Sequence, residues 1–340
     1  MATIKDIAQL TGVSCTTVSN VIHGRSKRVS AETISRINDA IKQLGYVPNM
    51  SARSLVSNSS RVIAVINHSV LAHKANFMED PFHSSFIGIV EENLRAHDYY
   101  LMIRTVADPG ELLAFAQNWN VDGMFVTGIF KDAFFDTLTT LNIPIVLIDS
   151  YVKHPDICNI GLEDFAGSYQ ATHHLIENGH RHIVFVSPFV TPGGVLYERL
   201  SGYRCALSDA GITPCGQYIL ESDLTAKSYT KLAQSIIARP EITGIVTTAD
   251  VIAAGLMKSF FELGKQIPED YSIVGFDDLL ISRITNPSLT TIHQDMYQKG
   301  KYAVDAMIQC LDGTKPRKTE MILPTKLIRR GSVKKIGDIG

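Results

Sequence analysis

From residue 61 to about residue 290, short apolar runs alternate with amphipathic stretches, and this alternation constrains the fold more than any other feature. The apolar runs are Val62–Ile66, Leu101–Ile103, Met124–Val126, Ile145–Ile148, Ile183–Val186, Ile245–Val246 and Ile273–Phe276. Runs of this length, separated by helical stretches of about 10–15 residues, are typical of βαβ units with parallel strands. We therefore predict an α/β fold with parallel sheets for this region.

The region after residue 60 is long for one such sheet, which favours two lobes. A weak internal sequence similarity supports this division, because residues 121–126 and residues 242–246 carry similar patterns around a glycine. In open α/β sheets, ligands bind beyond the carboxyl ends of the strands. Two lobes that face each other are therefore expected to hold a small ligand in the cleft between them.

The first 46 residues predict three short helices, with Thr3, Ser14 and Ser30 placed to cap their N-termini. This part is also basic. Residues 1–60 carry seven Lys and Arg against three Asp and Glu, whereas the rest of the chain carries 25 against 31. A small basic N-terminal part, here called the head (residues 1–60), followed by an acidic remainder indicates a module that binds a polyanion, joined to a domain with another function.

Residues 47–60 form a separate segment that is rich in serine and asparagine. Pro48 and Asn49 are placed to open one short helix, and the tail of the segment has the composition of a linker. A helix this short is not stable alone in water, so we expect it to fold only on a partner.

The composition excludes several other classes of protein. With 45% hydrophobic and 19% charged residues, the chain is an ordinary globular protein and not a disordered one. It shows neither a transmembrane stretch nor a signal-peptide pattern, so we expect a cytoplasmic protein without a membrane partner. The five cysteines are scattered, and no nucleotide-binding or nucleophile motif occurs. We therefore expect no metal, no cofactor, no catalytic residues and no enzymatic activity.

Six ordered segments between Thr3 and about Gly331 carry a family resemblance. They are IKDIAQLTGVSCTTVSNVIHG, LGYVPNMSARSL, ENGHRHIVFVS, YERLSGY, IPEDYSIVGFDD and NPSLTTIHQD. With these segments, the chain resembles the lactose-repressor/galactose-repressor family of bacterial transcription regulators. The resemblance implies a helix-turn-helix domain at 1–46, a hinge helix and linker at 47–60, and a two-lobed core like that of periplasmic sugar-binding proteins.

The lobes of this family exchange strands. The resemblance therefore implies an N-terminal lobe of residues 61–162 with 293–322, and a C-terminal lobe of residues 163–292 with 323–330. It also implies a homodimer, because the chain shows no C-terminal leucine heptads of the kind that make a family member tetrameric. A twofold dimer requires a roughly palindromic operator.

The resemblance places the DNA-reading residues on the helix that follows Ser14. It implies base contacts for Cys15, Thr16 and Asn20, and phosphate contacts for Ser14, Thr17 and Ser19. Small side chains let such a helix approach the major groove closely, and asparagine pairs with adenine through two hydrogen bonds. The alternative for the head is a small surface helix bundle without a DNA-binding role.

The resemblance also assigns roles in the hinge. Leu55 matches the residue that wedges into the central base step, Ala52 matches the small residue against the floor of the minor groove, and Arg53 lies near phosphate. Apolar wedges of this kind kink DNA. The alternative is a plain linker that contains a leucine by chance.

For the cleft, the resemblance implies that Asp149, Arg199, Asp250 and Asp277 point toward an effector and that Phe82 stacks on one face of it. Carboxylates accept hydroxyl hydrogen bonds and a guanidinium donates to two oxygens, which suits a polyol. The alternatives are that Asp250 and Asp277 merely cap helices and that Arg199 is a plain surface residue.

We therefore predict a dimeric transcriptional repressor of carbohydrate-utilisation genes that binds operator DNA and responds to a small ligand, with a sugar expected. One alternative is control by a protein co-regulator, a phosphorylated carrier of sugar uptake. A binding protein or enzyme of the same core fold is a third hypothesis, which the basic head and the missing nucleophile motif disfavour.

Overall fold

The computed structural model describes residues 2–22, 24, 26–46, 59–68, 77–314 and 318–337. The chain divides into two compact units, Met1–Ser60 and Arg61–Gly340. The predicted hinge helix, with Ala52, Arg53 and Leu55, lies outside the described residues. Within the described residues, no helix is long and apolar enough to cross a membrane.

The first unit holds the three predicted helices, α1 (Ile4–Thr11), α2 (Cys15–Ile22) and α3 (Ala31–Leu44). They pack on a small core of fully buried Ile7, Val18 and Ile37. Each helix contributes at least one residue to this core, because its apolar residues recur at helical spacing and lie on one side.

The predicted N-terminal caps of these helices are confirmed. Thr3 and Asp6 form a reciprocal capping box, in which Asp6 Oδ2 accepts from the Thr3 amide at 2.8 Å and Thr3 Oγ1 accepts from the Asp6 amide at 3.4 Å. Ser30 Oγ accepts from the Thr33 amide at 3.3 Å. These bonds satisfy backbone donors that have no partner inside their helices.

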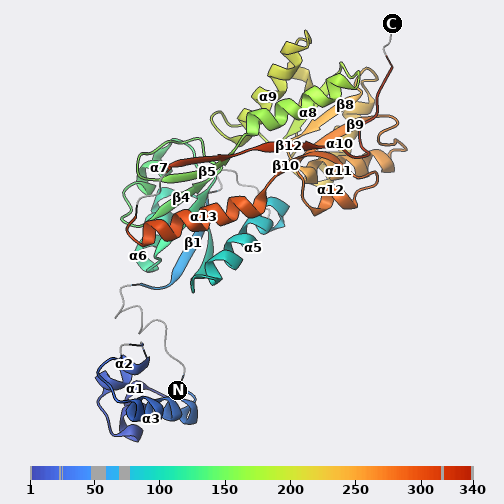
Figure 1. Cartoon of the computed structure of the whole chain (residues 1–340). Helices are drawn as coiled ribbons and strands as arrows, with labels where there is room; N and C mark the ends of the chain where they lie inside the picture. The colour runs from blue at the N-terminus through green and yellow to red at the C-terminus, as the bar shows by residue number, and fades with distance from the viewer. Residues whose placement is uncertain are drawn as a thin grey trace. The chain divides into compact units, whose positions relative to one another are not determined.

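The second unit contains two six-stranded sheets, so the predicted α/β fold with parallel sheets is confirmed. The first sheet has the order β11 (Glu320–Leu323), β5 (Cys158–Leu162), β4 (Ile145–Ile148), β3 (Gly123–Thr127), β1 (Val62–His68), β2 (Tyr100–Val106), and its pairs are parallel. Figure 1 shows α5 (Pro81–Arg95) and α13 (Met296–Leu311) side by side along this sheet. Residues of α6 (Pro109–Asn118) and α7 (Ala133–Leu138) pack in the cluster on its other face.

The second sheet has the order β12 (Thr325–Ile328), β10 (Thr290–Gln294), β9 (Ser272–Asp277), β8 (Gly244–Thr247), β6 (Ile183–Ser187), β7 (Ile219–Glu221). Only the β10–β12 pair among the described pairs is antiparallel. One face is covered by α8 (Asp164–Glu177) and α9 (Val195–Asp209), the other by α10 (Ala226–Ile237) and α11 (Asp250–Glu262). The short α12 (Leu280–Ile284) packs against α11.

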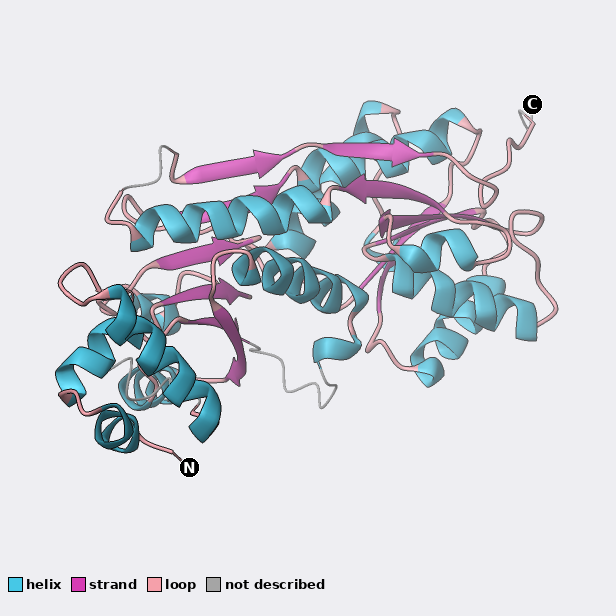
Figure 2. Cartoon of the chain, turned by 60° about the horizontal axis from the view of Figure 1, so that its bottom comes forward, coloured by secondary structure: helices cyan, strands magenta, loops and turns pink. Residues whose placement is uncertain are grey.

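The chain passes between the two sheets three times: from β5 to α8, from β10 to α13, and from β11 to β12 (Figure 2). The second passage lies after Gln294, two residues later than the expected change before residue 293, because β10 stays in the second sheet to its end. The third passage lies after Leu323, one residue later than expected. These passages bring strand ends of both sheets to one region of the core.

Candidate functional site

The exposed surface of α2 carries the residues expected to read DNA. Cys15 and Thr16 are exposed, Ser19 and Asn20 are half-buried, and Val18 on the opposite side is buried in the head core. Because positions four apart share a helix face, Cys15 with Ser19 and Thr16 with Asn20 form two adjacent rows. The arrangement presents small thiol, hydroxyl and amide groups on one side of a well-anchored helix.

Ser14 and Thr17, two of the residues expected at phosphates, are already engaged with each other. Their hydroxyl groups lie 2.9 Å apart in a hydrogen bond, and Ser14 Oγ accepts from the Thr17 amide at 3.1 Å. Both residues thus stabilise the N-terminus of α2, which carries partial positive charge favourable to an anion.

A second set of candidate residues lies at the strand ends of the two sheets. Asp149 directly follows β4 and Asp277 ends β9, whereas Asp250 is the first residue of α11. The backbone of Asp149 has φ 50° and that of Asp277 has φ 117°, both in the left-handed region. Side chains are uncommon in this region, and such conformations cluster at ligand-binding sites.

Lys299 of α13, which the sequence analysis did not single out, joins two of these carboxylates. Its ammonium group donates to both oxygens of Asp149 at 2.7 Å and to Gln294 Oε1 at 2.8 Å. The Gln294 amide then donates to Asp277 Oδ1 at 2.6 Å. A continuous polar path therefore runs from the end of β4 in the first sheet to the end of β9 in the second.

Arg199 of α9 extends this path. Its Nε donates to Asp164 Oδ1 at 2.8 Å and its Nη1 donates to the Thr248 carbonyl at 2.5 Å, with Asp277 Oδ1 3.9 Å away. The guanidinium lies 3.6 Å from the centroid of the Phe276 ring. Because Arg199 is buried, the alternative of a plain surface residue is wrong.

Asp164 lies where both lobes meet. While one of its oxygens accepts from Arg199, the other accepts from the Tyr151 hydroxyl at 2.8 Å. Burial raises the pKa of Asp164, the adjacent Arg199 guanidinium opposes that change, and the Asp149 charge adds to it. Tyr151 follows β4 of the first sheet, whereas Asp164 and Arg199 belong to the second lobe. The Tyr151–Asp164 hydrogen bond is therefore a second link between the lobes, beside that of Lys299 with Gln294.

Both carboxylate oxygens of Asp250 accept hydrogen bonds from residues of its own lobe, one just after β9 and one in β10. Thr291 donates its hydroxyl to Oδ1 at 2.5 Å, and the Leu279 amide donates to Oδ2 at 3.0 Å. Burial raises the pKa of Asp250 to about 7. Burial also raises the pKa of Asp277 well above its ordinary value, although Arg199 opposes this change. Asp250 thus fixes the loop after β9, and Asp277 faces the polar path.

Phe82 lies at the start of α5, and its ring centroid is 5.2 Å from the Lys299 ammonium. It also meets the His83 ring edge-on at 5.2 Å. The partner of His83 is Asp80, whose carboxylate caps α5. Phe82 therefore provides an aromatic face beside the polar path.

The structure thus brings Phe82, Asp149, Arg199 and Asp277 together, with Asp250 beside them. The linking residues that the sequence analysis missed are Tyr151, Asp164, Gln294 and Lys299. Lys299 carried a usable signal, since it lies three residues after buried Met296 and four before buried Ala303, on the apolar stripe of its helix.

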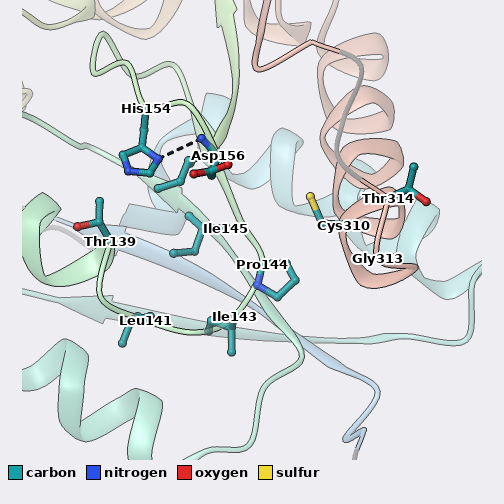
Figure 3. Close-up of a pocket in the computed structure, with 11 residues that line it drawn as sticks. Thr139, Leu141, Ile143, Pro144, Ile145, His154, Asp156, Cys310, Gly313 and Thr314 are labelled. Carbon is teal, nitrogen blue, oxygen red and sulfur yellow. Dashed lines mark hydrogen bonds between the residues drawn. The ribbon is translucent and has the colours of Figure 1, made fainter.

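A pocket of about 350 Å³ lies elsewhere in the first lobe, at the amino ends of its strands. Figure 3 shows it between residues 139–157 and the C-terminal end of α13, with the Asp156 amide donating to His154 Nδ1 at 3.2 Å. None of the expected effector residues lines it. In the described part of the chain, no group of three or more His, Cys, Asp and Glu side chains is placed to hold a metal ion.

A helix-turn-helix head joined to a two-lobed, parallel α/β core defines a class of DNA-binding transcription regulators. Comparisons with known proteins agree with this class. Residues 3–49 match the family described as bacterial regulatory proteins, lacI family, and residues 172–333 match a periplasmic binding protein-like domain. The chain belongs to the lacI family of bacterial regulatory proteins.

Two curated relatives and two solved structures illustrate the similarity. Proteins named HTH-type transcriptional repressor PurR are 32% identical in Mannheimia succiniciproducens, over 99% of this chain and 100% of the relative, and 32% identical in Edwardsiella ictaluri, over 98% and 97%. The lac repressor dimer bound to operator and the anti-inducer ONPF has a TM-score of 0.82 at 25% identity, covering 98% of this chain and 99% of that one. A complex of the transcriptional regulator CelR with cellobiose has a TM-score of 0.71 at 25% identity, covering 98% and 100%.

These relatives and structural neighbours are regulators. The predicted family is therefore confirmed, and so is the prediction that the chain is not an enzyme. The residue roles implied by the resemblance stay predictions.

Proposed function

We propose that this protein is a repressor that binds a pseudo-palindromic operator as a dimer and responds to a sugar or sugar derivative between its lobes. The observation that carries the proposal is the polar path from Asp149 through Lys299 and Gln294 to Asp277, beside the Phe82 ring. Aromatic faces next to carboxylates suit a ligand rich in hydroxyl groups. Carbohydrate-utilisation genes are the proposed targets.

The surroundings of Asp149 support a hydroxyl-rich ligand. The Asp149 side chain is 14% exposed, whereas its partner Lys299 is fully buried, so solvent or a ligand reaches the carboxylate and not the ammonium. A structural neighbour of the same architecture is described as a complex with cellobiose. A sugar hydroxyl that donates to Asp149 would add a hydrogen bond on the solvent side of the carboxylate, opposite the Lys299 ammonium.

The two links between the lobes supply a route from ligand to DNA. Tyr151 bonds Asp164, and Lys299 bonds both Gln294 and Asp149. A ligand that engages the exposed Tyr151, or Asp149 beside Lys299, therefore changes how the lobes are held together. Coupling of this kind is reciprocal: a ligand that lowers operator affinity must bind the free protein more tightly than the DNA-bound form. The proposed lobes are residues 61–162 with 295–323 and residues 163–294 with 324–330, because the chain changes sheets after Gln294 and after Leu323.

Exposed apolar side chains on the second lobe support a dimer. Phe261 at the end of α11 is 78% exposed, and Leu280 and Ile284 of α12 are each 70% exposed. The last two lie four residues apart on one helix face, and α12 packs against α11. Exposed apolar residues that share one helix face, as Leu280 and Ile284 do, are typical of association surfaces, and the structural neighbour bound to operator is described as a dimer. A second copy of this chain is the proposed occupant.

In the DNA complex, we propose base contacts for Cys15, Thr16 and Asn20, and phosphate contacts for Ser14, Thr17 and Ser19. The free polar surface of α2 and the cap at its N-terminus support these roles. In the hinge, Leu55 is proposed to wedge into the central base step and Ala52 to lie against the floor of the minor groove, with Arg53 near phosphate.

A thermal-shift screen of the full-length protein tests the effector proposal. The panel contains sugars, polyols, sugar phosphates and nucleobases, and each compound that raises the Tm is then added to an operator-binding assay. A ligand at about 100 times its Kd adds about 2.7 kcal/mol to the free energy of unfolding, which a Tm shift reports.

The proposal expects a sugar to raise the Tm, to change operator affinity, and to lose its effect in the Phe82→Ala variant. A matched control is Trp119→Ala, which removes an exposed aromatic ring that lies before the amino end of β3, at the opposite end of the strands of the first sheet from the polar path, and should leave the shift intact. A nucleobase as the only ligand would contradict the sugar class. A panel without any ligand would favour control by a phosphorylated carrier protein, which a pull-down with that carrier tests.

A further inference from the structure

The exposed side of α2 lacks positive charge. Residues 15–22 contain no Lys or Arg, although the head as a whole is basic. The groups that this side presents are the Cys15 thiol, the hydroxyls of Thr16 and Ser19, and the Asn20 amide. Its choice of base must therefore come from neutral groups.

The Asn20 amide is available for such a choice. The side chain is half-buried beside the exposed Thr16, one turn earlier on the same face. Among the described residues, no hydrogen bond partner engages the Asn20 side chain, in contrast to the mutually bonded hydroxyls of Ser14 and Thr17. Its carbonyl oxygen and its NH₂ group can therefore both be used on DNA.

Base edges in the major groove discriminate between such groups. Guanine presents two acceptors, O6 and N7, and is normally recognised by the two donors of an Arg or Lys. Adenine presents the N7 acceptor next to the N6 donor, which complements the donor and acceptor of one amide. Thymine presents a methyl group, which packs against small apolar surface such as the methyl group of Thr16.

We propose that α2 selects A·T base pairs in each half-site, with Asn20 recognising one adenine through N6 and N7 and Thr16 packing on a thymine methyl. This inference rests on the proposed function, since it requires that α2 enters the major groove. It adds the base class that the helix reads, and it names Asn20 as the residue that fixes it.

Selection from a library of palindromic DNA with randomised half-sites, using the full-length protein, tests the proposal. We expect the wild type to enrich adenine at one position of each half-site. In Asn20→Ala, the preference at that position alone should fall by roughly 5- to 150-fold, the discrimination that one bidentate contact provides. In Asn20→Arg, the preferred base at the same position should change to guanine.

Ser19→Ala is the matched control, because Ser19 is the chain neighbour proposed to contact phosphate. It should lower affinity for all sequences without changing the preferred base. Enrichment of guanine at the position that Asn20→Ala affects would overturn the proposal, as would an unchanged preference in that variant. A wild-type protein that selects no sequence would instead refute operator binding itself, so the two failures are distinguishable.

Discussion

Lys299 donates hydrogen bonds from its ammonium group to both carboxylate oxygens of Asp149, each at 2.7 Å. The pair joins α13 to the end of β4, and the third ammonium hydrogen reaches Gln294 of the second sheet at 2.8 Å. The two partners are unequal, because the Lys299 side chain is 0% exposed and that of Asp149 is 14% exposed. Removal of either partner therefore has a different consequence.

Asp149→Asn should destabilise the protein more than Lys299→Met. The first variant leaves a fully buried ammonium without its counter-charge, which typically costs about 3–5 kcal/mol. The second leaves a carboxylate that water reaches in part, so the loss should be smaller. Urea unfolding measures both. The double variant should be more stable than Asp149→Asn alone, because no uncompensated charge stays buried; the reverse order of the single variants would contradict this account.

Gly202→Ala should weaken the second lobe severely. A Cβ at this position of α9 would lie 2.2 Å from the Phe165 carbonyl oxygen and 2.9 Å from the Tyr169 nitrogen, both backbone atoms of α8. The helices must then separate, at a cost of about 3 kcal/mol in the free energy of unfolding, the upper end of the usual range for overpacking. Because Arg199 lies one turn before Gly202 and Asp164 begins α8, their 2.8 Å contact should lengthen as well.

The matched control is Gly88→Ala in α5, where a Cβ meets nothing within 4 Å. This change should raise the free energy of unfolding by roughly 0.4–1 kcal/mol, since alanine restricts the unfolded chain more than glycine. Thermal or urea unfolding of the two variants in parallel checks both signs. Equal effects at the two positions would show that α8 and α9 do not approach as closely as described.

The buried carboxyl group of Asp250 should leave a signature in the pH dependence of stability. Burial raises its pKa from 3.8 to about 7 in the folded protein, so the folded state holds a proton that the unfolded state releases near pH 4. Between these pH values folding takes up a proton, and the contribution of Asp250 to stability therefore falls as pH rises. We expect the free energy of unfolding of the wild type, minus that of Asp250→Asn, to become smaller or more negative from pH 4 to pH 7. A difference that stays constant or grows with pH would refute the raised pKa.

Leu280→Asp combined with Ile284→Asp should convert a dimer into monomers. Each side chain is 70% exposed, so the substitutions place two charges on the proposed association surface without removing core contacts. Sedimentation velocity measures the change in mass. Lys258→Asp on the exposed face of α11 adds a similar charge and should leave the dimer intact. Dimers that survive the double substitution would place the association surface elsewhere.

The sequence predicted most of the fold because its signals are local. The apolar runs located the central strands, and the Thr3–Asp6 and Ser30 caps located helix starts. The strand β10 escaped prediction since its fully buried residues include Thr290 and Thr291, which are polar. Each is satisfied by a distant partner: Thr291 donates to Asp250, and the Arg330 amide donates to Thr290 Oγ1. Only the folded chain brings such partners together.

The candidate site could be predicted only in part, because some of its contacts join residues far apart in the sequence. The family resemblance supplied Asp149, Arg199 and Asp277, and the structure places all three on one polar path. Lys299 was missed, although its place on an apolar helix stripe is visible in the sequence. Its pairing with Asp149, 150 residues away, depends on the passage of the chain from β10 to α13 and leaves no local pattern.

A footprinting titration of the full-length protein on DNA from upstream of its own gene tests the central claim most directly. A dimeric, operator-binding regulator predicts symmetric protection of two half-sites. It also predicts an affinity that falls linearly with salt on a log–log scale, because the basic head must release counterions from the phosphates it contacts. Absence of a protected site at low salt, or binding that salt does not weaken, would contradict the account.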